Sequence, residues 1–272
     1  MLFPQNKRRH YRAALTKTER AVASFNESDA LAVVHLGDII DGVKECGIVS
    51  TERTYKDLRR VLSVLSHLRK PLLHVLGNHC VLLERESLLT TLKIEKPGYY
   101  YRNLSSMWRL IVIDTVDVSL NRDRRHPHFA EARDYLQAHR GEPHAKLWNG
   151  GLGAKQTRWL EQILARTAAD GRFAVVCGHI PIVEEASESE GVIYGHKEVE
   201  KVLAAHGCVK AYFSGHHHAG GYAHKGGIHH VTFEGIIDAD DDNGAFALVE
   251  LRKDKIVVRG RGTMTSRALQ IG

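Results

Sequence analysis

The chain has 272 residues, 43% hydrophobic and 26% charged, which is long enough to bury one sizeable core. It has no run of about 18 apolar residues that could cross a membrane, and its four cysteines show no paired CxxC spacing, so we expect a cytoplasmic protein with reduced thiols. The formal net charge of +6 favours anionic partners, but basic residues alternate with acidic ones as on a solvated surface, and no nucleic-acid-binding motif is present.

The first part of the chain alternates helical and strand patterns. A helix is expected over 8–26, and the short apolar run 30–36 is typical of a buried parallel strand. Apolar residues at helical spacing predict a second helix over 55–68, which Pro71 ends. A second strand is then expected over 72–76.

The rest of the chain continues this alternation and then turns to consecutive strands. The polar stretch 121–153 is expected to be a long functional loop. Further strands are expected at 99–104, 109–114, 173–177, 209–213, 228–233, 245–251 and 255–259, and helices at 130–139, 154–168 and 196–206. Helix and strand units followed by strands predict one α/β domain over 1–272, with sheets packed inside helices.

Four short motifs place polar side chains directly after predicted strands. The motifs are Gly37-Asp38-Ile39-Ile40-Asp41, Gly77-Asn78-His79, Gly178-His179 and Gly215-His216-His217-His218. Because the carboxyl ends of parallel strands meet at one edge of a sheet, residues far apart in the sequence converge there. Each motif alone could be a turn or a structural histidine, but their joint placement predicts a metal site.

The residue types of these motifs suit a pair of divalent metals. Asp38 can bridge two metals that are about 4 Å apart, since each carboxylate oxygen can bind one of them. Asn78 offers an amide oxygen, and His179, His216 and His218 offer imidazole nitrogens. Mixed oxygen and nitrogen ligands of this kind hold the metals of phosphate-ester hydrolases.

Two further residues of the motifs are candidates for catalysis. His79 directly follows the ligand Asn78, where it could stabilise charge on phosphorus or give a proton to the leaving oxygen. Asp41 is placed to orient His79 through a hydrogen bond.

Three other segments are weaker candidates. In Trp148-Asn149-Gly150-Gly151, Asn149 and Gly150 could contact a substrate phosphate, although a glycine turn before the next helix is an equal alternative. Arg259-Gly260-Arg261-Gly262 could bind an anion or form an exposed basic turn. The acidic run from Asp238 to Asp242 is interpreted as a solvated loop.

The order of the motifs, GD-x-x-D, GNH, GH and GH-x-H, resembles that of the calcineurin-like metallophosphoesterases. Within that superfamily, several segments are similar to the manganese-dependent ADP-ribose/CDP-alcohol diphosphatases. These segments are Arg8 to Arg12, Leu36 to Gly42, Trp148 to Gly151, Gly215 to Tyr222, Phe233 to Gly235 and Arg259 to Gly262. The resemblance covers nearly the whole chain.

The resemblance implies a metallophosphoesterase fold, in which two packed β-sheets are flanked by helices in an αββα sandwich. It also implies two divalent metals, expected to be Mn²⁺, with Fe, Zn or Mg as alternatives. Asp38 would bridge them. One metal would bind Asn78, His179 and His216, and the other would bind His218.

The same resemblance assigns the chemistry. His79 corresponds to the family's catalytic histidine, and a metal-bound hydroxide would attack phosphorus. The expected substrates are small nucleotide-type molecules, namely ADP-ribose, CDP-alcohols or related compounds whose diphosphate is cleaved.

The chain departs from the family pattern at its start. The family opens with a central strand ending in Asp-x-His, or Asp-x-Gln in this subgroup, which supplies ligands to the metal that His218 serves. Residues 1–7 contain neither an aspartate nor a strand pattern. We therefore expect the first central strand to be missing, as in a truncated gene, and the second metal site to be incomplete.

Two alternative functions fit the same sequence. A catalytically impaired or inactive binding or scaffold protein would explain the missing strand, although keeping the ligand set argues against it. A phosphodiesterase acting on cyclic nucleotides or RNA would suit the basic charge. The sequence does not fix the substrate, because loops such as 121–153 shape the pocket, and it does not fix the oligomeric state.

Overall fold

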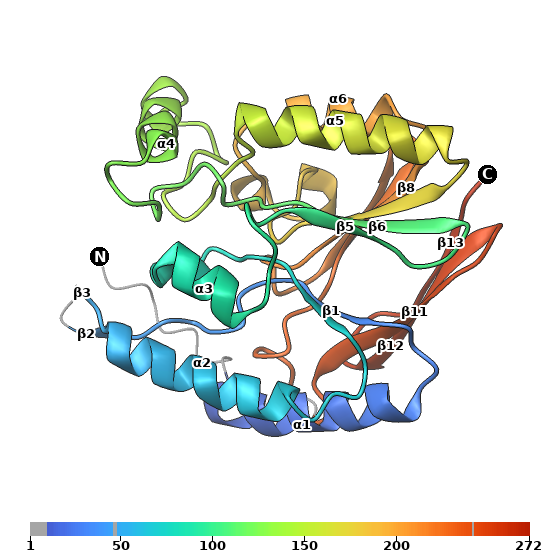
Figure 1. Cartoon of the computed structure of the whole chain (residues 1–272), viewed down its shortest axis with the longest axis horizontal. Helices are drawn as coiled ribbons and strands as arrows, with labels where there is room; N and C mark the ends of the chain where they lie inside the picture. The colour runs from blue at the N-terminus through green and yellow to red at the C-terminus, as the bar shows by residue number, and fades with distance from the viewer. Residues whose placement is uncertain (1–9, 46–47, 241) are drawn as a thin grey trace.

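The computed structural model describes residues 10–45, 48–240 and 242–272, and two layers of strands lie between helices in this part of the chain (Figure 1). The helices are α1 (Tyr11–Glu27), α2 (Thr51–Leu65), α3 (Arg85–Thr91), α4 (Pro127–Ala138), α5 (Ala154–Ala169) and α6 (His196–Ala204). Three short 3₁₀ turns are η1 (Cys80–Leu82), η2 (Glu184–Ala186) and η3 (Ser189–Gly191).

One layer is a six-stranded sheet in the order β5-β6-β7-β8-β10-β9. Its strands are β5 (Tyr100–Asn103), β6 (Trp108–Val112), β7 (Phe173–Cys177), β8 (Val209–Ser214), β9 (Gly221–Lys225) and β10 (Ile228–Thr232). The four inner strands are parallel, and the two edge strands are antiparallel to them. The central strands are apolar and buried along nearly their whole length, as expected for strands covered on both faces.

The other layer consists of two separate small sheets. The parallel pair is β1 (Val33–His35) with β4 (Leu72–His74), and the antiparallel sheet is β11 (Ala245–Leu251), β12 (Lys255–Gly262) and β13 (Arg267–Gln270). In Figure 1, α5 and α6 lie above the six-stranded sheet, while α1 and α2 lie below β1, β11 and β12. The αββα arrangement is therefore confirmed. The strands β2 (Lys44–Glu45) and β3 (Ile48–Val49) form a further antiparallel pair.

The parallel strands bring the four motifs together. The end of β7 is in register with the ends of β6 and β8, where Cys177 lies opposite Val112 and Phe213. In the smaller pair, His35 lies opposite His74. The motifs with Asp38, Asn78, His179 and His216 follow β1, β4, β7 and β8, respectively, so all four leave the strands at their carboxyl ends.

The structure differs from the expected elements in several places. Helix α2 begins at Thr51 and ends at Leu65, earlier than expected at both ends, and α3, β9 and β13 were not expected at all. The expected absence of a first strand concerns residues 1–7, which lie outside the described residues, and the single domain stays a prediction. Within the described ranges, no helix is long and apolar enough to cross a membrane.

Candidate metal centre

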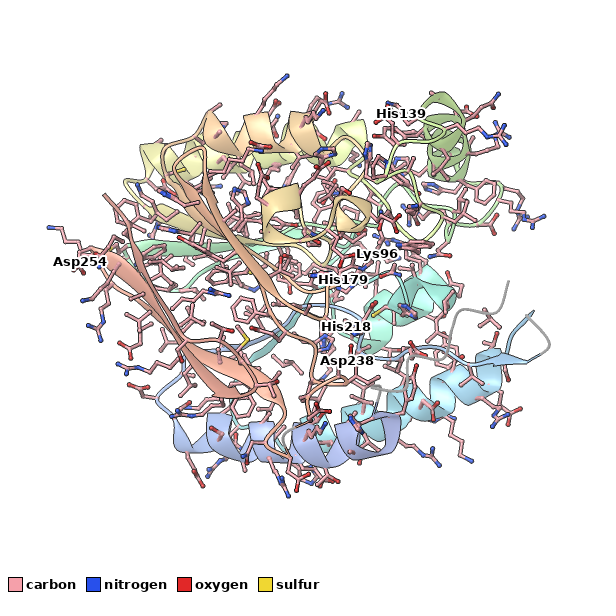
Figure 2. All side chains as sticks on the ribbon, turned by 180° about the vertical axis from the view of Figure 1, so that it is seen from behind. Lys96, His139, His179, His218, Asp238 and Asp254 are labelled. Atoms are coloured by element: carbon pink, nitrogen blue, oxygen red, sulfur yellow. The ribbon has the colours of Figure 1, made fainter. Side chains whose placement is uncertain are left out.

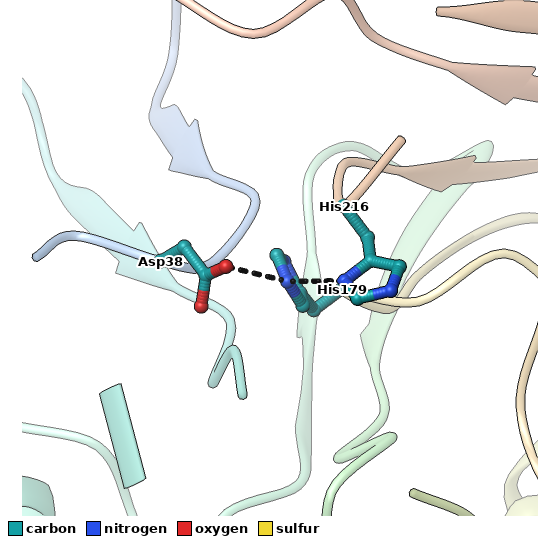
Figure 3. A group of neighbouring side chains, drawn as sticks. All are labelled: Asp38, His179 and His216. Carbon is teal, nitrogen blue, oxygen red and sulfur yellow. Dashed lines mark hydrogen bonds and ion pairs between the residues drawn. The ribbon is translucent and has the colours of Figure 1, made fainter. Parts of the chain in front are cut away.

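His179 lies between Asp38 and His216 (Figure 3). Asp38 Oδ2 lies 3.1 Å from His179 Nε2, while Asp38 Oδ1 accepts a hydrogen bond of 2.8 Å from the main-chain N–H of His79. His179 Nδ1–H donates to the carbonyl oxygen of Leu36 at 2.8 Å. Both sides of the pair are therefore held in place by main-chain groups.

Asn78 and His216 complete this group. Asn78 Oδ1 lies 3.0 Å from His179 Nε2 and 3.1 Å from His216 Nδ1, and the two imidazole nitrogens are 3.3 Å apart. Asn78 and His179 are buried, while Asp38 and His216 are partly exposed. In the described part of the chain, Asp38, His179 and His216 are the one group of three acidic, histidine or cysteine ligand atoms that lie within 4.8 Å of one another.

Asp38 and His179 stabilise each other's charged forms. Burial acts to raise the pKa of Asp38, but the charge and hydrogen bond of His179 outweigh it and hold that pKa well below its usual value. Burial acts to lower the pKa of His179, but Asp38 outweighs it and the pKa is raised. Burial, helped by the charge of His179, lowers the pKa of His216 to about 3, so this imidazole is neutral near pH 7.

The tautomer of His179 shows why a metal fits. Because Nδ1–H donates to Leu36, the neutral ring of His179 carries its lone pair on Nε2. His179 Nε2 then faces Asp38 Oδ2, Asn78 Oδ1 and His216 Nδ1 at 3.0–3.3 Å, so four atoms that can bind a metal surround one point. Either a proton on Nε2 or a divalent metal can satisfy such a set, and carboxylate, amide and imidazole ligands suit Mn²⁺, Fe²⁺ or Zn²⁺.

Two of these residues have strained main chains. Asp38 has φ of 53° and His216 has φ of 67°, a left-handed conformation that residues other than glycine seldom adopt. Strain of this kind persists where the surrounding structure enforces it, and it concentrates at functional sites. The turn after each strand is therefore shaped to aim these side chains inward.

His79 and Asp41 lie side by side next to this group. His79 Nδ1–H donates to the main-chain carbonyl of Asp41 at 2.7 Å, and the Asp41 carboxylate is farther away, at 3.3 Å. Asp41 therefore orients His79 chiefly through its main chain. The side chain of His79 is about one-third exposed.

His218 lies outside the group of three. It contacts Asp238, and Figure 2 shows the two side chains together below His179. The interpretation of Asp238 as part of a solvated loop was wrong, because its carboxylate is largely covered and one oxygen is fully buried. An acidic run gives no local signal for such a role, since it depends on packing against distant residues.

The structure places Asn149 and Gly150 in the interior. The Asn149 amide donates to the carbonyl oxygens of His144 at 3.0 Å and Glu190 at 2.7 Å, and its Oδ1 has no hydrogen-bond partner among the described residues. Gly150 packs against the main chain of residues 115–118. These contacts hold the loop together, and a role in substrate binding stays a prediction.

Gly77 is the residue whose substitution would test this geometry most directly. A Cβ at this position would overlap Asp38 Oδ1 and the Asp38 main-chain nitrogen. We expect Gly77→Ala to lower the free energy of unfolding by about 1–3 kcal/mol, because the main chain around Asp38 must shift. Denaturant unfolding measures this change.

Gly207→Ala is the matched control for Gly77→Ala, since its Cβ would meet no atom within 4 Å. An equal effect of the two substitutions would contradict the close packing at Gly77.

Comparisons with known proteins show which family the sequence and fold resemble. A family model described as calcineurin-like phosphoesterase matches residues 10–220. A manganese-dependent ADP-ribose/CDP-alcohol diphosphatase of Bos taurus is 30% identical over 300 aligned positions, covering 98% of this chain and 88% of the relative. The Homo sapiens protein of that name is 27% identical, covering 98% and 86%. A crystal structure described as a dimetal phosphatase from Danio rerio has a TM-score of 0.88 at 25% identity, covering 97% of this chain and 91% of that one.

Proposed function

Because the chain belongs to the calcineurin-like phosphoesterase family and is a hydrolase, we propose that it cleaves the diphosphate of ADP-ribose, CDP-alcohols or related nucleotide compounds. Mn²⁺ is the metal proposed, with two ions, and the second site is proposed to be incomplete, with Asp38 and His218 as its ligands. The observation that carries the proposal is the close approach of side-chain oxygen and nitrogen atoms from Asp38, Asn78, His179 and His216. The names of the relatives support the substrate class and the metal.

Most of these residues would bind the metals, and His79 would act as a proton donor. Asp38 would bridge the two ions, Asn78, His179 and His216 would hold one of them, and His218 would hold the other. Bound divalent metals would neutralise charge on the phosphate oxygens and lower the pKa of a water molecule. In its imidazolium form, His79 would give the Nε2 proton to the leaving oxygen and become neutral, while Nδ1–H stays hydrogen-bonded to the carbonyl oxygen of Asp41.

Product analysis tests this proposal. Purified protein is stripped of metal with a chelator and reloaded with Mn²⁺, and it is then given ADP-ribose, CDP-choline, cyclic AMP or a short RNA. We expect AMP from ADP-ribose or CMP from CDP-choline, no product before reloading, and little turnover of the other two substrates. Turnover of cyclic AMP or RNA alone would favour the phosphodiesterase alternative, and no turnover of any substrate would favour the scaffold.

A cytoplasmic location is part of the same proposal. Cys80, Cys177 and Cys208 are free and buried, which fits a reducing compartment. Cys46 lies outside the described residues.

A further inference from the structure

We propose that Asp238 is a positioning residue that fixes the tautomer and the direction of the His218 imidazole. The proposal rests on the proposed function, in which His218 holds the second metal. It concerns a residue that the sequence pattern places in a solvated loop, whereas the structure places it beside a metal ligand.

The contact between the two side chains is direct. Asp238 Oδ2 lies 3.0 Å from His218 Nδ1, and the side chains are 22% and 27% exposed, respectively. The second oxygen, Asp238 Oδ1, is buried and has no hydrogen-bond partner among the described residues. A buried carboxylate with one free oxygen is costly unless positive charge lies near it, and a metal on His218 would supply such charge.

Two residues from the start of the described chain hold the main chain on either side of Asp238. They are His10, which directly precedes helix α1, and Lys17 within α1. The N–H of His10 donates to the carbonyl oxygen of Ile237 at 2.8 Å, and the buried ammonium of Lys17 donates to the carbonyl oxygen of Ala239. Lys17 is only 3% exposed, and a lysine is rarely buried without a specific partner. These two contacts fix the segment that carries the carboxylate.

The ring of His218 is held from the same segment. The N–H of Gly235 donates to the carbonyl oxygen of His218 at 3.0 Å, and the N–H of Asp238 donates to the carbonyl oxygen of Gly235 at 3.2 Å. A Cβ on Gly235 would lie 2.8 Å from Cγ of the imidazole, so glycine is needed for this close approach. The ring of His218 therefore packs closely against the segment that carries Asp238.

The contact between Asp238 and His218 is a hydrogen bond, and the two side chains do not form a separate metal site. A separation of 3.0 Å would also suit two ligands of one ion, but no third histidine, cysteine or acidic ligand atom of the described residues joins them within 4.8 Å. The carboxylate therefore takes the Nδ1–H of His218, which leaves the lone pair on Nε2. Histidine ligands are commonly fixed in this way by a carboxylate on the other nitrogen.

The first experiment reads the tautomer without any metal. In metal-free protein labelled with ¹⁵N-histidine, the signals of His218 are identified by their loss in His218→Gln. At alkaline pH we expect the Nδ1–H tautomer of His218 in the natural protein and in Asp240→Asn, and the Nε2–H tautomer in Asp238→Ala. Asp240 is the matched control, because it lies two residues away on the surface, where it contacts His10. An Nε2–H tautomer in the natural protein would overturn the proposal.

The second experiment measures Mn²⁺ binding by calorimetry. We expect Asp238→Ala to lower the affinity for one of two Mn²⁺ ions by about 10- to 100-fold and to leave the affinity for the other ion unchanged. Asp238→Asn, which keeps an acceptor oxygen without the charge, should fall between Asp238→Ala and the natural protein. Unchanged affinities for both ions in Asp238→Ala would overturn the proposal. If the Mn²⁺ affinities change as expected but the protein cleaves no diphosphate, the proposed function is overturned and the role of Asp238 stands.

Discussion

Asp38→Asn is expected to lower kcat/KM by about 10³-fold or more, with loss of bound metal. The substitution keeps the shape of the side chain, and its Oδ1 can still accept the hydrogen bond from the His79 N–H. It removes the charge that raises the pKa of His179 and that would bridge the two metals. Steady-state kinetics measures the loss of rate, and elemental analysis measures the metal content.

Asp57→Asn provides the control for Asp38→Asn. It makes the same chemical change on the surface of α2, where Asp57 pairs with Arg60 at 3.2 Å. Exposed ion pairs contribute little, so kinetics and metal content should match those of the natural protein. An Asp38→Asn protein that kept its metal and its rate would show that Asp38 is not a ligand.

His79→Ala is expected to lower kcat by about 10²- to 10⁴-fold while the metals stay bound. Its main-chain N–H, and not its ring, contacts Asp38, and alanine keeps that N–H. The ring contacts Asp41 and is absent from the cluster of ligand atoms. Kinetics with saturating Mn²⁺, together with elemental analysis, separates this loss of proton transfer from the loss of metal expected for Asp38→Asn.

His67→Ala is the matched control for His79→Ala. His67 is an exposed histidine just beyond the end of α2, and its ring contacts the carbonyl oxygen of Val64. Its removal should leave both kcat and metal content unchanged. Equal kcat in His79→Ala and the natural protein would remove the His79 ring from the mechanism.

The position of the metal centre could be predicted from the sequence because glycine and polar residues directly follow each predicted strand. Each of the four motifs follows a parallel strand, β1 and β4 in the two-stranded sheet and β7 and β8 in the six-stranded sheet, and within each sheet the parallel strands present their carboxyl ends together. That logic placed Asp38, Asn78, His179 and His216 correctly next to one another. The ligand roles themselves stay a prediction until metal binding is measured.

The missed features have no strong local pattern. Strand β9 has the sequence Gly-Tyr-Ala-His-Lys and lies at a sheet edge, so it has no continuous apolar run. The environment of Asp238 depends on α1, more than two hundred residues earlier in the chain, through the contact of Lys17 with Ala239. Asn149 is likewise buried by contacts with Glu190 in a distant segment. Such long-range packing cannot be inferred from composition or periodicity.

The proposed ligands lie in four separate loops, so a bound metal would stabilise the fold. Asp38, Asn78, His179 and His216 follow four different strands, so one bound ion would act as a crosslink across most of the chain. A ligand that binds only the folded state stabilises it by about 4 kcal/mol when its concentration is a thousand times its Kd. The unfolding temperature would therefore rise with the supply of free Mn²⁺, and the amount of folded protein would follow metal availability.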